Sequence, residues 1–221
     1  MARIAAFFDL DHTLLDTDSG RLYLRYLRRY VRDEIRLFDA VRAIAWLAAY
    51  KLHFLDQGEV TTRALTLLKG KNEKEMERRA EHWFDTTVAS RVYGMWREKI
   101  AVHHAEGHLT SILTASTRYA AAPVARFLGI DEILCTSLEV KDGVFTGATE
   151  KPTCQGAGKV YWAQRLAEAK GIDLSKSYFY TDSINDIEML EAVQHPICVN
   201  PDRKLRRIAR ARGWEILSLK R

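Results

Sequence analysis

The chain has 221 residues, of which 47% are hydrophobic and 29% charged, and its formal net charge is +5. This length allows one large domain or a core with a smaller insert, and this composition excludes an intrinsically disordered chain. The mild positive excess suits small anionic molecules as well as nucleic acid. The three cysteines, Cys135, Cys154 and Cys198, are widely spaced and form no CxxC pair, which argues against a zinc knuckle or a disulfide framework.

The sequence also bears on cellular location. No apolar run reaches the ~18 residues that a membrane-spanning helix needs. The richest candidate, residues 40–55, is interrupted by Arg42 and Lys51. The first residues lead into a strand pattern and have no signal-peptide character. We therefore expect a cytoplasmic protein without a membrane span, in a reducing compartment.

Two closely spaced carboxylates follow the first apolar stretch. Residues 4–8 predict a buried strand, which ends at Asp9 and Asp11. Alternate side chains of an extended chain share a face, so these like charges would repel unless a divalent cation with oxygen ligands compensates them. Acidic residues at this place fit open α/β sheets, whose ligands bind beyond the carboxyl ends of the strands. Taken alone, the stretch also fits a strand followed by an acidic turn.

A long segment of helical character comes next. From residue 18 to 99 there is no proline and little glycine, and apolar residues recur at helical spacing. Asn72 with Glu75 three positions later has the pattern of a capping box, and Gly70 and Gly107 are candidate helix ends. Helices are expected near residues 22–30, 35–48, 60–68, 73–88 and 93–106. We expect residues 17–99 to form an all-helical insert.

Strand and helix patterns then alternate to the end of the chain. Asp142-Gly143 between β-prone flanks predicts a hairpin over residues 138–149. Strands are expected at 109–113, 132–136, 177–180, 196–199 and 214–217, and helices at 123–128, 156–170, 185–192 and 202–212. This alternation predicts an α/β fold with a mostly parallel sheet and helices on both faces. Residues 1–16 and 100–221 would form this core.

Three later positions carry polar groups suited to phosphoryl chemistry. Thr114 follows a strand, and its hydroxyl with the next backbone N–H would hold a phosphate oxygen. Lys159 opens a helix, where it would neutralise an anion. Asp182 and Asp186 follow another apolar strand, four residues apart, as a metal ligand and a supporting carboxylate. Each also has a simpler interpretation, such as a helix N-cap for the aspartates or a solvated lysine.

These four pieces, starting with the D-x-D-x-T pattern at residues 9–13, resemble in order and spacing the four motifs of the haloacid dehalogenase-like (HAD) phosphohydrolases. The resemblance covers the whole chain and is closest to the phosphoserine-phosphatase-like branch, subfamily IB. The loop CQGAGK before Lys159 and the ending VNPDRKLRRIARARGWEIL are similar to that branch. The resemblance implies a three-layer Rossmann-like core with a helical cap of type C1 inserted after the first strand.

The resemblance also implies a mechanism and a cofactor. Asp9 would attack the phosphorus of a phosphomonoester and form an aspartyl-phosphate, with Asp11 as general acid and then general base. Mg²⁺ would be bound by Asp9, Asp182 and the backbone carbonyl of Asp11. Phosphate oxygens would be held by Thr114, the N–H of Ala115, Lys159 and Asn185. Asp186 would orient the metal shell, and Thr13 would brace the loop.

The sequence departs from the family pattern at a few positions. Thr181 stands where the family commonly has glycine, and Thr114 replaces the more frequent serine. Asp18 can be placed at the acidic position that follows motif I in phosphoserine phosphatases. However, Thr62 occupies the position of their carboxylate-binding arginine, with Arg63 beside it.

The expected substrate is a small phosphorylated metabolite, with phosphoserine and histidinol phosphate as candidates. One alternative is a phosphotransferase that delivers the phosphoryl group to another alcohol. Another is a non-catalytic protein that binds nucleic acid or an anionic surface through the basic helix at residues 202–212. That helix has no interleaved aromatic residues for base stacking, and no nucleic-acid partner is expected.

Overall fold

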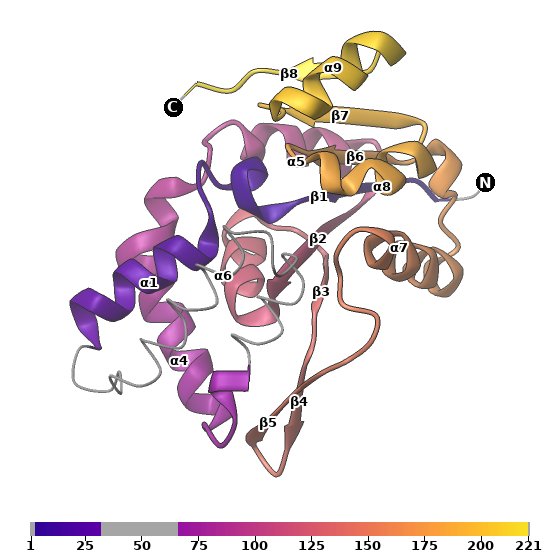
Figure 1. Cartoon of the computed structure of the whole chain (residues 1–221). Helices are drawn as coiled ribbons and strands as arrows, with labels where there is room; N and C mark the ends of the chain where they lie inside the picture. The colour runs from indigo at the N-terminus through magenta and orange to yellow at the C-terminus, as the bar shows by residue number, and fades with distance from the viewer. Residues whose placement is uncertain (1–2, 32–65, 221) are drawn as a thin grey trace.

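A six-stranded parallel sheet forms the centre of the computed structural model, which describes residues 3–31 and 66–220 (Figure 1). The strand order is β3-β2-β1-β6-β7-β8, and every neighbouring pair is parallel. The strands are β1 (Ala5–Phe8), β2 (Leu109–Thr117), β3 (Glu132–Thr136), β6 (Tyr178–Thr181), β7 (His195–Val199) and β8 (Glu215–Leu217). The predicted α/β class with a mostly parallel sheet is therefore confirmed.

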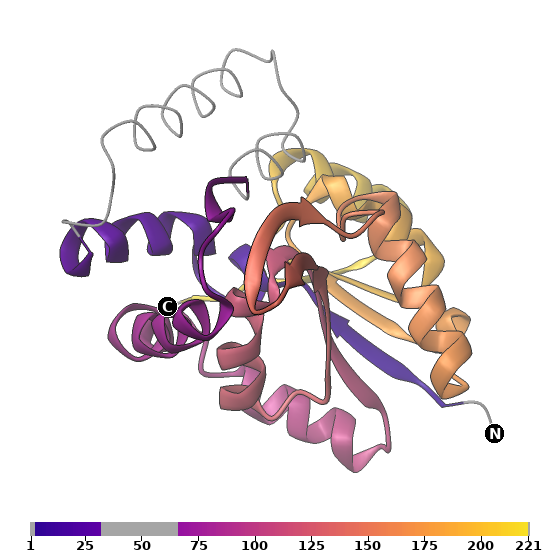
Figure 2. The ribbon, with the colours of Figure 1, turned by 90° about the horizontal axis from the view of Figure 1, so that it is seen from below.

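Helices cover both faces of this sheet, and Figure 2 shows the resulting three layers. On one face, Phe8 and Ile112 pack in the same core cluster as residues of α5 (Trp96–Ala105) and α6 (Arg118–Leu128). On the other face, Phe7 and Leu113 pack with residues of α7 (Ala157–Lys170), α8 (Ile187–Ala192) and α9 (Arg203–Arg212). Successive strand residues thus enter opposite cores, which explains why β1 is apolar throughout rather than alternating.

The direction in which the chain adds strands to the sheet reverses at β1. From β1 the chain adds β2 and β3 on one side, and it later adds β6, β7 and β8 on the other side. Phe8 pairs with Tyr180, and the backbone N–H of Asp9 donates to the carbonyl of Tyr180 over 2.9 Å. The carboxyl ends of these two strands therefore lie side by side, although they are far apart in sequence. Such a switch point is where open α/β sheets bind their ligands.

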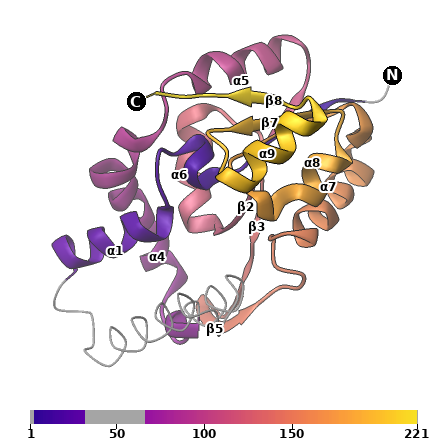
Figure 3. The same cartoon turned by 45° about the horizontal axis from the view of Figure 1, so that its top comes forward.

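The described part of the insert is helical. It contains α1 (Ser19–Tyr30), a short 3₁₀ helix (Thr66–Leu68) and α4 (Glu73–Trp83). Figure 3 shows α1 and α4 on the same side of the molecule, and the hydroxyl of Tyr26 lies 2.9 Å from Nδ1 of His82. Asn72 caps α4 by accepting from the N–H of Glu75, as the sequence predicted. The helix expected at 35–48, most of that at 60–68, and Thr62 with Arg63 lie outside the described residues.

A hairpin joins the core to this insert. It consists of β4 (Leu138–Lys141) and β5 (Val144–Thr149), with Asp142 and Gly143 at φ values of +52° and +75° in the predicted turn. The N–H of Gly70 donates to the carbonyl of Phe145, and the N–H of Phe145 donates to the carbonyl of Lys71. The hairpin thus pairs with the chain just before α4, a contact that no local pattern predicted.

The division expected between residues 99 and 100 falls within α5. Trp96 and Ile100 are both buried against the sheet, so this helix packs as one unit with the core. We propose that the core resumes at Trp96. In the described ranges, no helix has the length and apolar character needed to cross a bilayer.

Candidate active site

A buried ion-pair cluster lies at the carboxyl ends of β1 and β6. The ammonium of Lys159, in the first turn of α7, donates to Oδ1 of Asp9 over 2.7 Å and to Oδ2 of Asp186 over 2.8 Å. All three side chains are buried. Burial alone would lower the pKa of Lys159, but the charges of Asp186 and Asp9 hold it above its ordinary value. Lys159 therefore stays a cation and fixes the position of Asp9.

Asp182 adds a third carboxylate to this cluster. Within the described residues it is in no ion pair, and burial together with the charges of Asp9 and Asp186 raises its pKa to about 8. Burial, opposed by Lys159 and reinforced by Asp186, raises the pKa of Asp9 to about 6. The cluster thus contains three carboxylates, of which Asp9 and Asp186 are paired with the ammonium of Lys159. This excess of negative oxygen donors fits a divalent cation such as Mg²⁺, for which Asp9 and Asp182 are suitable ligands.

Asp11 lies in a different environment from Asp9. Its Oδ1 accepts from the N–H of Ser19 over 2.8 Å, and its Oδ2 accepts from the hydroxyls of Ser19 and Ser116 over 3.1 and 3.3 Å. Burial, with the charges of Asp18 and Asp9, raises the pKa of Asp11 to about 7. Directly after it, His12 adopts a φ of +56°, which turns the chain away from the strand. Asp11 is thereby held by neutral donors, as a group that can carry a proton near neutral pH.

The end of β2 places Thr114 and Ala115 at the same edge. Regular pairing with β3 shifts between Thr114 and Thr117, an irregularity of the bulge type. Bulges re-aim side chains and release backbone groups from the ladder. The hydroxyl oxygen of Thr114 accepts from the N–H of Ser116 over 3.1 Å, so the hydroxyl proton stays available to another acceptor.

Other predicted site residues have roles of different kinds. Asp18 is the N-cap of α1 and accepts from the N–H of Arg21 over 2.8 Å. Asn185 is exposed in the turn before α8, and its backbone N–H donates to Ser183. Among the described residues, the buried hydroxyl of Thr13 has no hydrogen-bond partner, so it does not brace the loop through a side-chain bond there. Instead, its backbone carbonyl accepts from the indole N–H of Trp96 over 2.9 Å.

Comparison with known proteins identifies the family of the chain. The profile of the haloacid dehalogenase-like hydrolase family matches residues 6–191, which include the carboxylates of β1 and β6. The chain belongs to this family. The HAD match thus covers most of the chain and confirms the resemblance seen in the motifs.

Relatives of this HAD protein carry phosphatase names. The chain is 33% identical to phosphoserine phosphatase SerB1 of Mycobacterium tuberculosis over 96% of its own length and 70% of that protein. It is 29% identical to a histidinol-phosphatase of Neisseria meningitidis over 97% and 98% of the two chains. The expected enzyme class, a HAD-type phosphatase, is confirmed.

Solved structures agree on the fold. A protein of unknown function from Bordetella pertussis superposes with a TM-score of 0.89 at 32% identity, over 98% of this chain and 99% of the other. A phosphoserine phosphatase with an analogue of the phospho-aspartyl intermediate superposes with a TM-score of 0.68 at 18% identity, over 100% and 95% of the two chains. At that identity the second likeness concerns the HAD fold alone.

Sequence reasoning missed three side chains that shape this HAD site. Ser19 and Ser116 hold Asp11, and the hydroxyl of Thr181 donates to Oδ2 of Asp186 over 2.6 Å. In the sequence, Thr181 stands out only as a departure from the glycine that is common in the family. Small hydroxyl residues at strand and helix ends are common, so their types gave little signal, and their partners depend on how distant segments meet.

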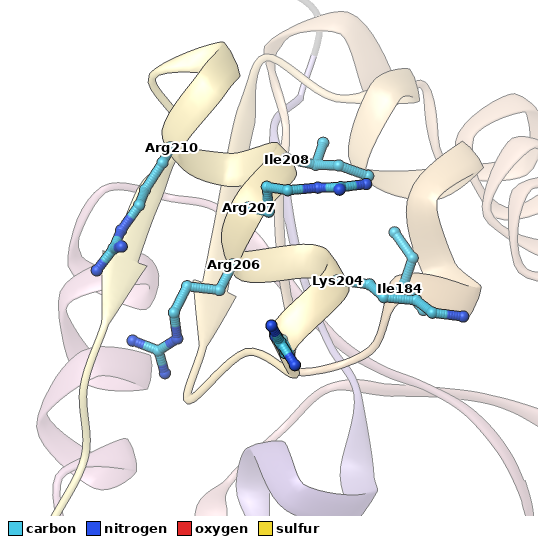
Figure 4. A pocket seen from close by; sticks show the side chains of 7 residues that line it. Ile184, Lys204, Arg206, Arg207, Ile208 and Arg210 are labelled. Carbon is cyan, nitrogen blue, oxygen red and sulfur yellow. The ribbon is translucent and has the colours of Figure 1, made fainter.

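The basic helix α9 lies beside the site rather than in it. Its N-cap Asp202 accepts from the N–H of Ile184, and its own N–H donates to the carbonyl of Asp182 over 3.0 Å. A cavity of about 740 Å³ lies along α9, lined by Ile184, Arg203, Lys204, Arg206, Arg207, Ile208 and Arg210. In Figure 4 the labelled basic side chains point in several directions from the helix. This cavity contains none of the predicted site residues.

Proposed function

We propose that this protein is a Mg²⁺-dependent phosphomonoesterase that hydrolyses a small phosphorylated metabolite through an aspartyl-phosphate on Asp9. The observation that carries the proposal is the separation of two neighbouring carboxylates into different environments. Asp9 is paired with the ammonium of Lys159, whereas Asp11 is bound by the neutral groups of Ser19 and Ser116. Two carboxylates with different surroundings suit a nucleophile and a proton donor, respectively.

In the first half-reaction, a carboxylate oxygen of Asp9 forms a bond to phosphorus while the bond from phosphorus to the ester oxygen breaks. Asp11 gives its proton to the departing alkoxide, which leaves as the alcohol. In the second half-reaction, the ionised Asp11 takes a proton from water, and the water oxygen attacks the phosphorus. Inorganic phosphate leaves, and the Asp9 carboxylate and the Asp11 proton are restored.

The remaining residues would stabilise charge on the phosphoryl oxygens. Lys159 and the hydroxyl of Thr114 lie at the carboxyl end of the sheet, where Asp9 follows β1. The N–H of Ala115 lies within the irregular stretch of β2. Asn185 would be a further donor, as the family resemblance implies. Mg²⁺ held by Asp9, Asp182 and the carbonyl of Asp11 would screen the phosphoryl oxygens from the anionic nucleophile. Asp186, bonded to Lys159 and Thr181, would keep this set in place.

The names of the relatives make phosphoserine and histidinol phosphate the first substrates to test. Asp18 is a candidate specificity residue, because it directly precedes Ser19, whose N–H donates to Asp11 over 2.8 Å. We further propose a reducing, cytoplasmic setting, in keeping with the free thiols of Cys135, Cys154 and Cys198.

Replacement of the nucleophile tests the covalent route. Asp9→Asn should lower Mg²⁺-dependent turnover of an aryl phosphate by about 10⁴-fold or more, with the fold retained by circular dichroism. Asp142→Asn is the matched control, because Asp142 is exposed in the hairpin turn and asparagine tolerates its positive φ. Full activity of Asp9→Asn would exclude the aspartyl-phosphate. A screen of phosphorylated metabolites with added acceptor alcohols separates hydrolysis from phosphotransfer by the ratio of free phosphate to new ester.

A further inference from the structure

A cluster of two histidines and a glutamate lies between the end of α5 and the start of β2. This is the amino end of β2, whereas the candidate active site lies at the carboxyl ends of the strands. Donor atoms of His103, Glu106 and His108 all lie within 4.8 Å of one another. Nδ1 of His103 and Nδ1 of His108 are 3.0 Å apart, and Nδ1 of His108 lies 3.4 Å from Oε2 of Glu106. The phosphatase chemistry proposed above uses none of these groups.

The local backbone explains why the two histidines meet. The N–H of His108 donates to the carbonyl of His103 over 2.9 Å, and the N–H of Gly107 donates to that of His104 over 3.0 Å. Gly107 has a φ of +76°, so these bonds form a Schellman motif that ends α5. In such a motif, the side chains at the first and last of these positions contact each other. Here that contact is formed by two imidazoles rather than by two apolar groups.

We propose that His103, Glu106 and His108 form a second metal site, separate from the carboxylate cluster, for a first-row transition ion such as Zn²⁺. Two imidazoles and one carboxylate are a donor set that zinc uses with water as the fourth ligand. Tetrahedral zinc with bonds of about 2.0–2.2 Å places its ligand atoms about 3.3 Å apart. The separations of 3.0 and 3.4 Å are close to this value.

The surroundings of His103 suit a ligand. Its other nitrogen, Nε2, lies 2.9 Å from the hydroxyl of Tyr180, whose oxygen can accept a hydrogen bond from Nε2–H, which leaves the Nδ1 lone pair for a metal. Burial, with the charges of His108, Lys99 and His104, lowers the pKa of His103 to about 4. His103 is therefore neutral at physiological pH, as metal binding requires.

Charge and access also favour a cation here. The cluster lies at the C-terminus of α5, where the helix dipole is negative. The Glu106 side chain is 53% exposed, so an ion can enter from solvent. Lys99, one turn earlier on α5, is positively charged and would repel a bound cation. The negative carboxylate of Glu106 would be needed to offset this repulsion.

The experiment is a Zn²⁺ titration of the full chain in excess Mg²⁺, followed by calorimetry and by measurement of the metal retained after gel filtration. One equivalent of Zn²⁺ should bind to the wild type. His108→Gln should lose it, and Glu106→Gln should bind roughly tenfold more weakly or worse, since even a change outside the ligand set costs this much. Glu106 is exposed, so its variant keeps the proposal testable if His108→Gln fails to fold.

Two further variants serve as controls. His104→Gln removes the neighbouring histidine, which bonds to Thr110 instead, and should retain the zinc. Asp182→Asn should also retain it, because Asp182 belongs to the catalytic edge. The proposal would be overturned if the wild type bound no zinc, or if His108→Gln and Glu106→Gln both bound zinc as the wild type does. It would also be overturned if only Asp182→Asn lost zinc binding. The two histidines would then be only a hydrogen-bonded pair that closes α5.

Discussion

Ser19 binds Asp11 twice, through its backbone N–H over 2.8 Å and through its hydroxyl over 3.1 Å. Ser19 is the first residue of α1, so the first helix of the insert directly positions a carboxylate of the core. The Ser19 hydroxyl also lies 2.9 Å from that of Ser116 in β2. The placement of the proposed general acid therefore depends on contact between the insert and the sheet.

This contact predicts that Ser19→Ala lowers kcat for an alkyl phosphate by roughly tenfold, because one of the donors that hold Asp11 is lost while the backbone donor remains. An aryl phosphate, whose leaving group needs less protonation, should be affected less. Steady-state kinetics on both substrates measures the difference. Ser175→Ala, which removes an exposed hydroxyl far from Asp11, is the control. Equal loss on both substrates would argue that Ser19 does not act through Asp11.

Replacement of Asp11 itself should have a larger effect of the same kind. Asp11→Asn removes the proton donor and should lower turnover of alkyl phosphates by about 10²–10⁴-fold. Activated aryl phosphates should form the phospho-enzyme faster than alkyl phosphates do, with hydrolysis of the intermediate slowed in both cases. Rapid-quench measurement of phosphate bound to protein separates the two steps. A uniform reduction for all leaving groups would contradict the assigned role.

The hydroxyl of Thr181 is predicted to stabilise the carboxylate cluster. Thr181→Val keeps the shape of the side chain but removes the 2.6 Å hydrogen bond to Asp186. Because Asp186 is buried, the loss of this bond should lower the free energy of unfolding by about 1–3 kcal/mol. It should also raise the Mg²⁺ concentration that gives half-maximal activity. Urea unfolding and activity against Mg²⁺ concentration provide the measurements. Thr86→Val, at an exposed helical position, should leave the Mg²⁺ dependence unchanged.

Removal of divalent ions should make stability depend on pH. Burial raises the pKa of Asp11 to about 7 and that of Asp182 to about 8, against an ordinary value of 3.8. An acid whose pKa is raised by folding stabilises the fold below its unfolded pKa, and this stability is lost as the pH rises through the folded pKa. In EDTA, these groups should therefore make Tm lower at about pH 8 than at about pH 6.

Added Mg²⁺ should raise Tm most at the higher pH, because the ionised carboxylates then have a compensating cation. Differential scanning calorimetry at both pH values gives the comparison. Asp182→Asn should show a smaller stabilisation by Mg²⁺, whereas Asp142→Asn should match the wild type. If Mg²⁺ stabilised Asp182→Asn as much as the wild type, the ion would bind elsewhere.

The sequence by itself determined the type of fold and the approximate positions of the strands, although the strand expected at 109–113 extends as β2 to Thr117. The apolar stretches that end at Asp9 and Asp182, and the alternation of strand and helix patterns after residue 107, are local signals that backbone periodicity explains. The hairpin turn at Asp142-Gly143 and the cap at Asn72 were predicted for the same reason, since each depends on only a few adjacent residues.

Only the tertiary structure decided which of these groups meet. Pairing of β1 with β6 brings Asp9 next to Asp182, and Lys159 joins Asp9 to Asp186 across 150 and 27 residues of chain. The pairs of Asp11 with Ser116 and of His103 with Tyr180 likewise join distant segments. Such contacts depend on strand order and on burial, which are set by packing of the whole chain. No short stretch of sequence therefore predicts them.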